Sequence, residues 1–169
     1  MKRMHKAYTL KYRRRRQGRT DYKLRLSLLI SRKPRFVIRR KLNNIFVHAV
    51  EYDTNGDKTV ASGHSRELLK YGWKGHKGNT PSAYLTGLLC GLRAKKKGIK
   101  EGILDIGLYR AVKGSSIFAA AKGIIDSKQE VKCNEKYFPS EERITGKNAK
   151  TDMTKNFYEV KNKILEKWQ

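Results

Sequence analysis

The sequence is poor in several residue types, and each scarcity excludes a class of protein. Only two cysteines occur among its 169 residues, and Cys90 and Cys133 match no metal-binding or redox spacing. We therefore expect both thiols to be reduced and incidental, in a cytosolic protein. No run of about 18 apolar residues occurs, which excludes a membrane-spanning helix. The first residues are basic and contain no apolar stretch, so we expect no secretory signal.

Acidic residues are also scarce, since 15 Asp and Glu face 40 Lys and Arg, for a formal net charge of +25. Much of this excess lies near the start. Residues 1–41 hold 17 Lys or Arg and a single acid, Asp21, and therefore carry +16. Such a segment repels itself, and we expect it to become ordered on a polyanion. The remaining chain is long enough to form one core.

The composition of this basic segment favours nucleic acid as the polyanion. Arginine outnumbers lysine by 11 to 6 in residues 1–41, and guanidinium groups bind phosphate with two hydrogen bonds and stack on bases. Tyr8, Tyr12 and Tyr22 are interleaved with the basic residues, and aromatic rings stack on unpaired bases. A membrane-surface helix would need a bulky apolar face, which residues 1–23 lack. A merely solvated charge run is the plain alternative, and charge alone does not separate RNA from DNA.

Hydrophobic patterns predict an α/β fold with a mixed sheet. Three strands form an antiparallel meander and a fourth strand is parallel; we place them at residues 36–38, 45–52, 58–64 and 102–108. The second strand is largely apolar on both faces, as in the centre of a sheet. Asn55 and Gly56 mark the hairpin turn before the third strand.

Two main helices are predicted to pack with this sheet. The first follows Thr80, which we expect to be its N-cap, and the second begins after Ser115 or Ser116. Gly87 and Gly91 give the first helix a face that another backbone can approach closely. Shorter or terminal helices are predicted at residues 24–30, 66–71 and 152–168, and we expect Ser65 to be the N-cap of the second of them. The last of them is amphipathic and either covers the core or docks on a partner.

The order of strands and helices is that of ribonuclease-H-like nucleases, which gather carboxylates to hold two divalent metals. Asp105 on the fourth strand is a lone acid, because the first strand and the helix over 81–97 contain none. We therefore expect no catalytic residues, and we expect Asp105 to bond neighbouring backbone or an arginine. The four histidines have no metal-ligand spacing, so we expect no metal and no cofactor.

Two basic, glycine-containing loops precede the two main helices. Residues 72–79 and 113–116 both lack the Gly-Lys-Ser/Thr sequence of a nucleotide-binding P-loop. Free N–H groups and the helix dipole nevertheless attract phosphate to a helix N-terminus. For these loops we favour contact with an RNA backbone over plain solvation.

Several segments together resemble one known family. YRRRRQGRTDY at 12–22, SREL at 65–68, YGWK at 71–74 and GNTPSAYLTGLL at 78–89 are similar to signatures of the 5S-rRNA-binding ribosomal protein of the large subunit, the universal family numbered eighteen, in its archaeal and eukaryotic form. ILDIGL at 103–108, KGS at 113–115 and FPSEERI at 138–144 match it in the same order. The resemblance covers roughly residues 8–148.

The resemblance implies a non-enzymatic constituent of the large ribosomal subunit in the cytoplasm. Such a protein binds 5S rRNA and attaches it to the large-subunit rRNA in the central protuberance. Its neighbours would include the universal large-subunit protein numbered five, and we expect neither a membrane nor a homo-oligomer. A chromatin-type DNA binder and a metal-dependent nuclease are the rival functions from other classes.

We divide the chain into a basic RNA-binding arm (1–33), an α/β core domain (34–128), an irregular segment (129–150) and a C-terminal amphipathic helix (151–169). We expect RNA contacts from the arm, from the glycine loop and from the N-termini of the main helices. The candidate residues are Tyr12, Arg13, Arg14, Arg15, Arg16, Arg19, Tyr22, Arg25, Arg32, Lys33, Arg35, Trp73, Lys74, Lys77, Asn79, Thr80, Lys113 and Ser115.

Overall fold

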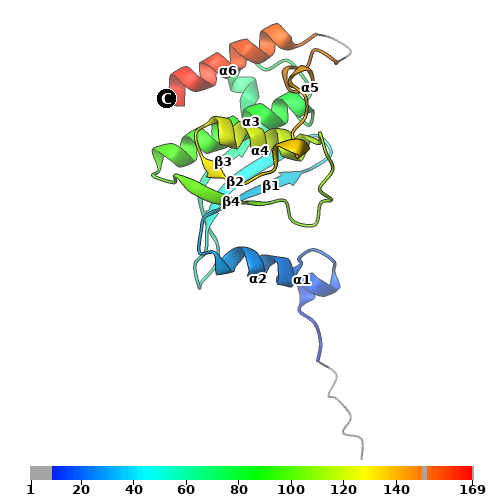
Figure 1. Cartoon of the computed structure of the whole chain (residues 1–169), viewed down its shortest axis with the longest axis vertical. Helices are drawn as coiled ribbons and strands as arrows, with labels where there is room; N and C mark the ends of the chain where they lie inside the picture. The colour runs from blue at the N-terminus through cyan, green and yellow to red at the C-terminus, as the bar shows by residue number, and fades with distance from the viewer. Residues whose placement is uncertain (1–8, 150–151, 169) are drawn as a thin grey trace, which may run out of the picture.

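The structure is a computed structural model, and it describes residues 9–149 and 152–168. Figure 1 shows the course of the chain. The helices are α1 (Arg13–Arg16), α2 (Tyr22–Ile30), α3 (Thr80–Lys96), α4 (Ser116–Asp126), α5 (Glu141–Thr145) and α6 (Thr154–Trp168), with 3₁₀ turns η1 (Ser65–Tyr71) and η2 (Glu135–Tyr137). The strands are β1 (Arg35–Arg40), β2 (Ile45–Glu51), β3 (Lys58–His64), β4 (Glu101–Asp105) and β5 (Glu130–Val131).

The five strands form one mixed sheet in the order β3-β2-β1-β4-β5. The pairs β1–β2 and β2–β3 are antiparallel, whereas β1–β4 and β4–β5 are parallel. The predicted α/β class, with three antiparallel strands and a parallel one, is therefore confirmed. The structure adds β5, which begins where Glu130 N donates to Lys100 O at 2.9 Å. A strand of two residues is too short to produce a periodic pattern.

Helices cover one face of the sheet. α3 packs on β2 and β3, and α4 packs on β1 and β5. On β2, Ile45, Val47 and Ala49 point into this core and are at most 1% exposed. Phe46 and His48 point to the opposite face and are only half-buried. The predicted central position of β2 is confirmed, because β2 lies between β3 and β1, and its second face at Phe46 and His48 is only partly covered.

The two main helices touch at their backbones. A Cβ atom added to Gly87 of α3 would lie 2.1 Å from the carbonyl oxygen of Ala120 in α4. One added to Gly91 would lie 2.0 Å from Ser127 Oγ. The glycines thus allow a close approach that the sequence predicted, and side chains from both helices then reach the sheet below them.

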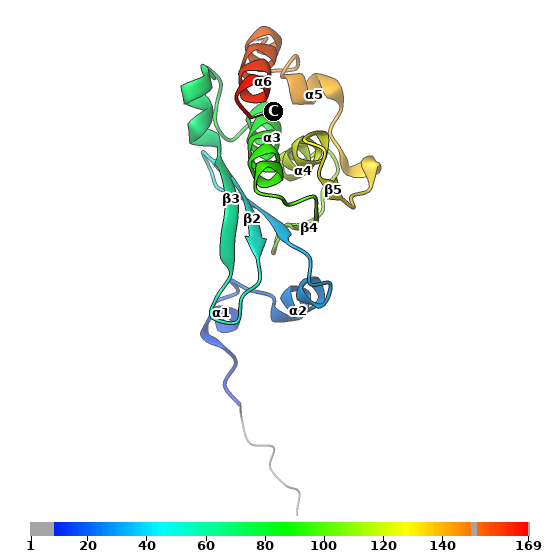
Figure 2. The ribbon, with the colours of Figure 1, turned by 90° about the vertical axis from the view of Figure 1, so that its left-hand side faces the viewer.

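Helix α6 covers the core, which resolves the alternative left open by its amphipathic pattern. Figures 1 and 2 show it stacked beyond α3, at the end of the molecule opposite α1 and α2. Phe157, Val160 and Ile164 on its inner face are at most 2% exposed. Trp168 Nε1 donates a hydrogen bond of 3.0 Å to the hydroxyl of Tyr71. Packing within the chain therefore accounts for the apolar face of this C-terminal helix.

Two helix caps lie one residue before the predicted ones. The N-cap of η1 is His64, whose Nδ1 accepts from Arg66 N at 2.9 Å, rather than Ser65. The N-cap of α3 is Asn79, whose side-chain oxygen accepts from Ser82 N at 3.0 Å, rather than Thr80. In each pair two adjacent polar residues are able to cap, so the sequence pattern does not decide between them.

Candidate nucleic-acid interface

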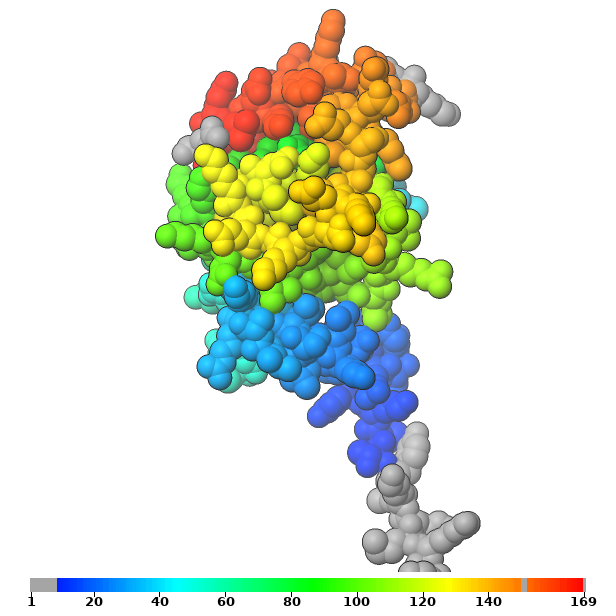
Figure 3. All heavy atoms as spheres, viewed as in Figure 1, coloured from blue at the N-terminus to red at the C-terminus, as the bar shows by residue number. Residues whose placement is uncertain are grey.

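The arm forms a short basic helix followed by a turn into α2. All four arginines of α1 are exposed. Arg14 Nε donates to Thr20 Oγ1 at 2.9 Å, and Asp21 caps α2 by accepting from Lys23 N at 2.9 Å. Gly18 adopts φ = 61°, a left-handed conformation that suits the turn. In Figure 3 this segment projects from the end of the molecule that lies away from α6.

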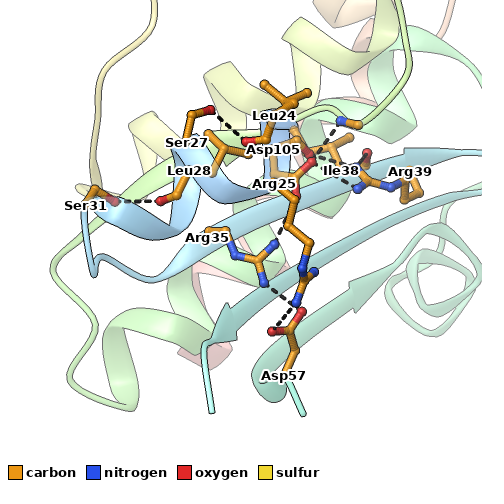
Figure 4. A network of polar contacts seen from close by, with 11 residues as sticks. Leu24, Arg25, Ser27, Leu28, Ser31, Arg35, Ile38, Arg39, Asp57 and Asp105 are labelled. Atoms are coloured by element: carbon orange, nitrogen blue, oxygen red, sulfur yellow. Dashed lines mark hydrogen bonds and ion pairs between the residues drawn. The ribbon is translucent and has the colours of Figure 1, made fainter. Parts of the chain in front are cut away.

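Ion pairs fasten α2 to the sheet. Arg25 of α2 lies 2.9 Å from one oxygen of Asp57, in the β2–β3 hairpin, and Arg35 lies 2.7 Å from the other. Asp105 lies 3.2 Å from Arg35 and 3.0 Å from Arg39 (Figure 4). Burial alone would raise the pKa of Asp57, but hydrogen bonds from Arg35 and Arg25 hold it below its usual value. The network fixes where the arm leaves the core.

Arg35 belongs to this structural network. Its side chain is only 2% exposed and both of its partners are carboxylates. A guanidinium buried between two carboxylates presents little surface to phosphate, so the structure gives no support to Arg35 as an RNA contact. Asp105 behaves as expected of a lone acid: besides its arginine partners it accepts from Gly107 N at 2.8 Å.

A cavity of about 300 Å³ lies between the arm and the core. Arg14 and Arg19 line it from the arm, Arg25 from α2, and Arg39 and Tyr109 from the core. Its volume is at the lower end of the range of about 300–1,000 Å³ found for ligand pockets. The guanidinium groups of Arg14 and Arg19 have no carboxylate partner among the described residues, whereas Arg25 and Arg39 are paired. The cavity is therefore suited to an anion.

Other candidate residues of the arm are distributed around this cavity. Tyr12 is 72% exposed, and its ring centroid lies 5.2 Å from that of Tyr22. Arg32 is exposed with φ = 56°, and Lys33 is paired with Glu101. The arm thus combines a pair of aromatic rings with exposed cations.

The glycine loop is held against α6. Lys74 N donates to Asn156 Oδ1 at 3.1 Å, and Asn156 Nδ2 donates to Gly72 O at 2.9 Å. Trp73 is 2% exposed and belongs to the hydrophobic core, so the structure gives no support to this residue as an RNA contact. Lys74 is exposed and Lys77 is half-buried. The loop therefore presents its lysines at the surface, whereas its tryptophan is buried in the core.

The N-terminus of α4 has unused hydrogen-bonding capacity. Ser115 is its N-cap but makes no side-chain capping bond. The hydroxyl oxygens of Ser115 and Ser116 are buried and without a hydrogen-bond partner among the described residues. Lys113, two residues before the cap, is exposed.

Arg143 is a residue that the sequence reasoning missed. A Cβ atom added to Gly114 would lie 3.1 Å from Arg143 Nη1. Arg143 also lines a cavity of about 170 Å³ together with Asn79 and Thr80, at the start of α3. Its side chain therefore stands between the N-termini of both main helices. It lies in a segment of weak periodicity, and no local pattern indicates that α5 brings it there.

The structure offers no sign of a catalytic or metal centre in the residues that it describes. Among residues 9–149 and 152–168, no three His, Cys, Asp or Glu side chains are grouped so that they could hold a metal ion. Both cysteines are free, and burial raises the pKa of Cys90 to about 12, which keeps its thiol protonated. None of the described helices has the length and apolar character needed to cross a bilayer.

One comparison with known proteins bears on this surface. Residues 6–102 match the family model described as ribosomal large subunit proteins 60S L5 and 50S L18. The match covers more than half of the chain. It begins within the basic arm and includes the meander, the glycine loop and α3, ending in β4.

Proposed function

The chain belongs to the family of the large-subunit ribosomal proteins 60S L5 and 50S L18, and from that membership we propose that it binds 5S rRNA and attaches it to the large-subunit rRNA. As a member of this family it is a ribosomal protein, and it takes part in translation within the large subunit of cytoplasmic ribosomes. The central protuberance as its place, and the universal large-subunit protein numbered five as its neighbour, are parts of the proposal.

The cavity between arm and core is the observation that carries the proposal. It presents Arg14 and Arg19 without carboxylate partners, beside the exposed arginines of α1. An ion pair on each of Arg25 and Arg39 holds the opposite wall in place. Double-stranded RNA is recognised through phosphates and shape, and specific recognition uses unpaired nucleotides. A preformed basic cavity suits one such nucleotide at a junction of two RNAs.

The proposed contacts form three groups, in the arm, the glycine loop and the two helix N-termini. We keep the sequence-based candidates other than Arg35 and Trp73, and we add Arg39 and Arg143. The proposed set is Tyr12, Arg13, Arg14, Arg15, Arg16, Arg19, Tyr22, Arg25, Arg32, Lys33, Arg39, Lys74, Lys77, Asn79, Thr80, Lys113, Ser115 and Arg143.

We propose a structural, non-enzymatic role without cofactor, membrane or homo-oligomer. Asp105 supports this reading, because arginines and backbone hold it, and no group of three metal-binding side chains occurs in the part of the chain that the structure describes. Two-metal nucleases require several carboxylates at one place. Magnesium-stimulated RNA cleavage that disappears in Asp105→Asn would contradict this part of the proposal.

Competition binding near physiological salt tests the choice of RNA. Labelled 5S rRNA is bound to the full chain and challenged with tRNA or with duplex DNA. We expect 5S rRNA to be preferred by about a hundredfold or more, which is within the range of specific over non-specific binding by nucleic-acid-binding proteins. Displacement by either competitor at equal mass would contradict 5S recognition, and preference for the DNA duplex would favour a DNA-binding function.

A further inference from the structure

The face of the sheet that α3 and α4 leave uncovered carries a group of rings. Phe46 and His48 alternate with the buried residues of β2 and therefore point away from the helices. His64 of β3 is paired with Phe46 in the antiparallel register. All three side chains are half-buried and thus reach the surface. We call Phe46, His48 and His64 the aromatic face.

The rings of the aromatic face are ordered with respect to one another. The centroids of Phe46 and His64 lie 4.2 Å apart at an interplanar angle of 77°. Those of Phe46 and His48 lie 6.4 Å apart and are nearly parallel, at 10°. Because cross-strand pairing and these ring contacts limit side-chain rotation, a planar ligand would meet a preorganised surface.

Positive charge surrounds the aromatic face. Lys41 Nζ lies 5.1 Å from the centroid of Phe46. Arg39 is paired with Phe46 across the strands and also lines the cavity beside the arm. Arg39 forms an ion pair with Asp105, so among the described residues Lys41 supplies the unpaired positive charge beside the rings. Arg39 connects the arm cavity to the aromatic face.

The imidazole rings are suited to stacking because they stay neutral. Burial lowers the pKa of His48, and the nearby His64 and Arg39 lower it further. Burial also lowers the pKa of His64, with Arg66 and Lys41 adding to the effect and Glu67 opposing it. The Nδ1 atom of His64 accepts from Arg66 N, so the neutral ring carries its proton on Nε2, which is a donor for a base edge.

We propose that the aromatic face is a platform on which an unpaired RNA base stacks, with its phosphate held by Lys41. This inference rests on the proposed RNA-binding function and adds a site to it. Aromatic rings on an open sheet, flanked by cations, stack bases without regard to their identity. The occupant is single-stranded RNA and not a protein, because the basic rim would repel the many other basic ribosomal surfaces and attracts phosphate.

Photocrosslinking of 5S rRNA that contains 4-thiouridine to the full chain tests this platform. We expect crosslinks in the peptide of β2 that holds Phe46, and about a tenfold or greater loss of affinity in Phe46→Leu. The dependence of affinity on salt should stay the same, because no charge is removed. Tyr158→Leu is the matched control, since this tyrosine is 48% exposed on α6. It should bind like the unaltered protein.

A second variant protects the test against misfolding. Thermal unfolding checks that Phe46→Leu is folded. His48→Gln removes another ring of the aromatic face, at a half-buried position outside the core. If both variants bind 5S rRNA as tightly as Tyr158→Leu while the unaltered protein still selects 5S rRNA, the platform is overturned and the proposed function stands. Loss of selectivity by the unaltered protein would overturn the proposed function instead.

Discussion

Arg35 Nη1 lies 3.2 Å from Asp105 Oδ2, and this ion pair joins the parallel strands β1 and β4. The two side chains are 2% and 9% exposed, so solvent scarcely screens them. Arg35 also binds Asp57, which in turn binds Arg25 of α2. The position of the arm therefore depends on an arginine whose side chain is almost entirely buried.

Replacing Asp105 by asparagine should destabilise the fold. The variant keeps the shape of the side chain but leaves the buried charge of Arg35 with one partner, Asp57. Breaking a buried pair costs about 3–5 kcal/mol, and we expect about 3 kcal/mol because Asp57 remains. Urea denaturation measures this. Glu142→Gln, which removes an exposed ion pair with Lys147, is the control and should change stability by less than about 1 kcal/mol.

Gly87→Ala should also be strongly destabilising, for a steric reason. The added Cβ would lie 2.1 Å from the carbonyl oxygen of Ala120, and backbone does not move aside as a flexible side chain does. Overpacking of this kind costs about 1–3 kcal/mol or more. Lys95→Ala on the exposed side of α3 is the matched helical control. A melting temperature as high in Gly87→Ala as in this control would contradict the close packing of α3 on α4.

Stability should fall as the pH is lowered from about 6.5 to 5. His48 and His64 have depressed pKa values in the folded chain, chiefly through burial. In this pH interval the two histidines become protonated in the unfolded chain, whereas in the folded chain they stay neutral to lower pH. Protonation therefore favours the unfolded state. The pKa values of Asp57 and Glu67 are lowered from 3.8 and 4.5 in the folded chain. Protonation of these carboxylates reduces stability further, but only at lower pH.

Urea midpoints at pH 7.5, 6.5 and 5.5, at constant ionic strength, measure this effect. His48→Gln removes one of the two groups and should make the dependence on pH shallower over this interval. An unaltered protein whose midpoint is the same at all three values would contradict the depressed histidine pKa values.

The sequence predicted those parts of the fold that local patterns determine. A run that is apolar on both faces located β2, the turn at Asn55 and Gly56 located β3, and the three- and four-residue spacing of Phe157, Val160 and Ile164 located α6. Gly87 and Gly91 indicated the close helix contact. In each case the signal lies within one stretch of the chain, which explains why these elements needed no tertiary information.

The features of the candidate site that the sequence did not reveal depend on contacts between distant segments. Arg35 has the same local character as the exposed arginines of the arm, and only its pairing with Asp57 and Asp105 makes it structural. Trp73 lies in a basic loop, yet α6 and the core bury it. Arg143 reaches the helix N-termini through an irregular segment. Local sequence contains no information on which of many like charges finds a partner.

Replacing all four arginines of α1 by alanine should weaken RNA binding broadly and leave the core intact. These side chains are exposed, and α1 has no buried residue. Each phosphate contact contributes about 0.7–0.9 to the slope of log affinity against log salt, so the slope should fall by about 3. Replacing Lys155, Lys161, Lys163 and Lys167 of α6 removes the same charge elsewhere and should change the slope less.

Loss of folding in the arginine variant would contradict the separation of arm and core. Equal effects of the two sets of substitutions would mean that net charge, and not the position of the arm, governs binding. Circular dichroism and the salt series together distinguish these outcomes.

Arg143→Ala should reduce affinity for 5S rRNA by about tenfold with little effect on stability. The side chain is exposed, and no carboxylate pairs with it in the part of the chain that the structure describes. A hydrogen bond to a charged group contributes about 1.5–3 kcal/mol, and a phosphate at this point would also meet the N–H groups of two helices. Lys132→Ala, an exposed cation outside these N-termini, is the control.

Arg143→Lys separates charge from geometry at this position. Lysine keeps the positive charge but binds phosphate as a point charge, whereas arginine binds with two parallel N–H groups. We therefore expect an affinity between those of the alanine variant and the unaltered protein, with the salt slope unchanged. If Arg143→Ala and Lys132→Ala bind equally well, Arg143 contributes only to the general field. If Arg143→Lys binds as weakly as Arg143→Ala, the guanidinium fork is essential, because only the fork can bridge a phosphate held between two helix N-termini.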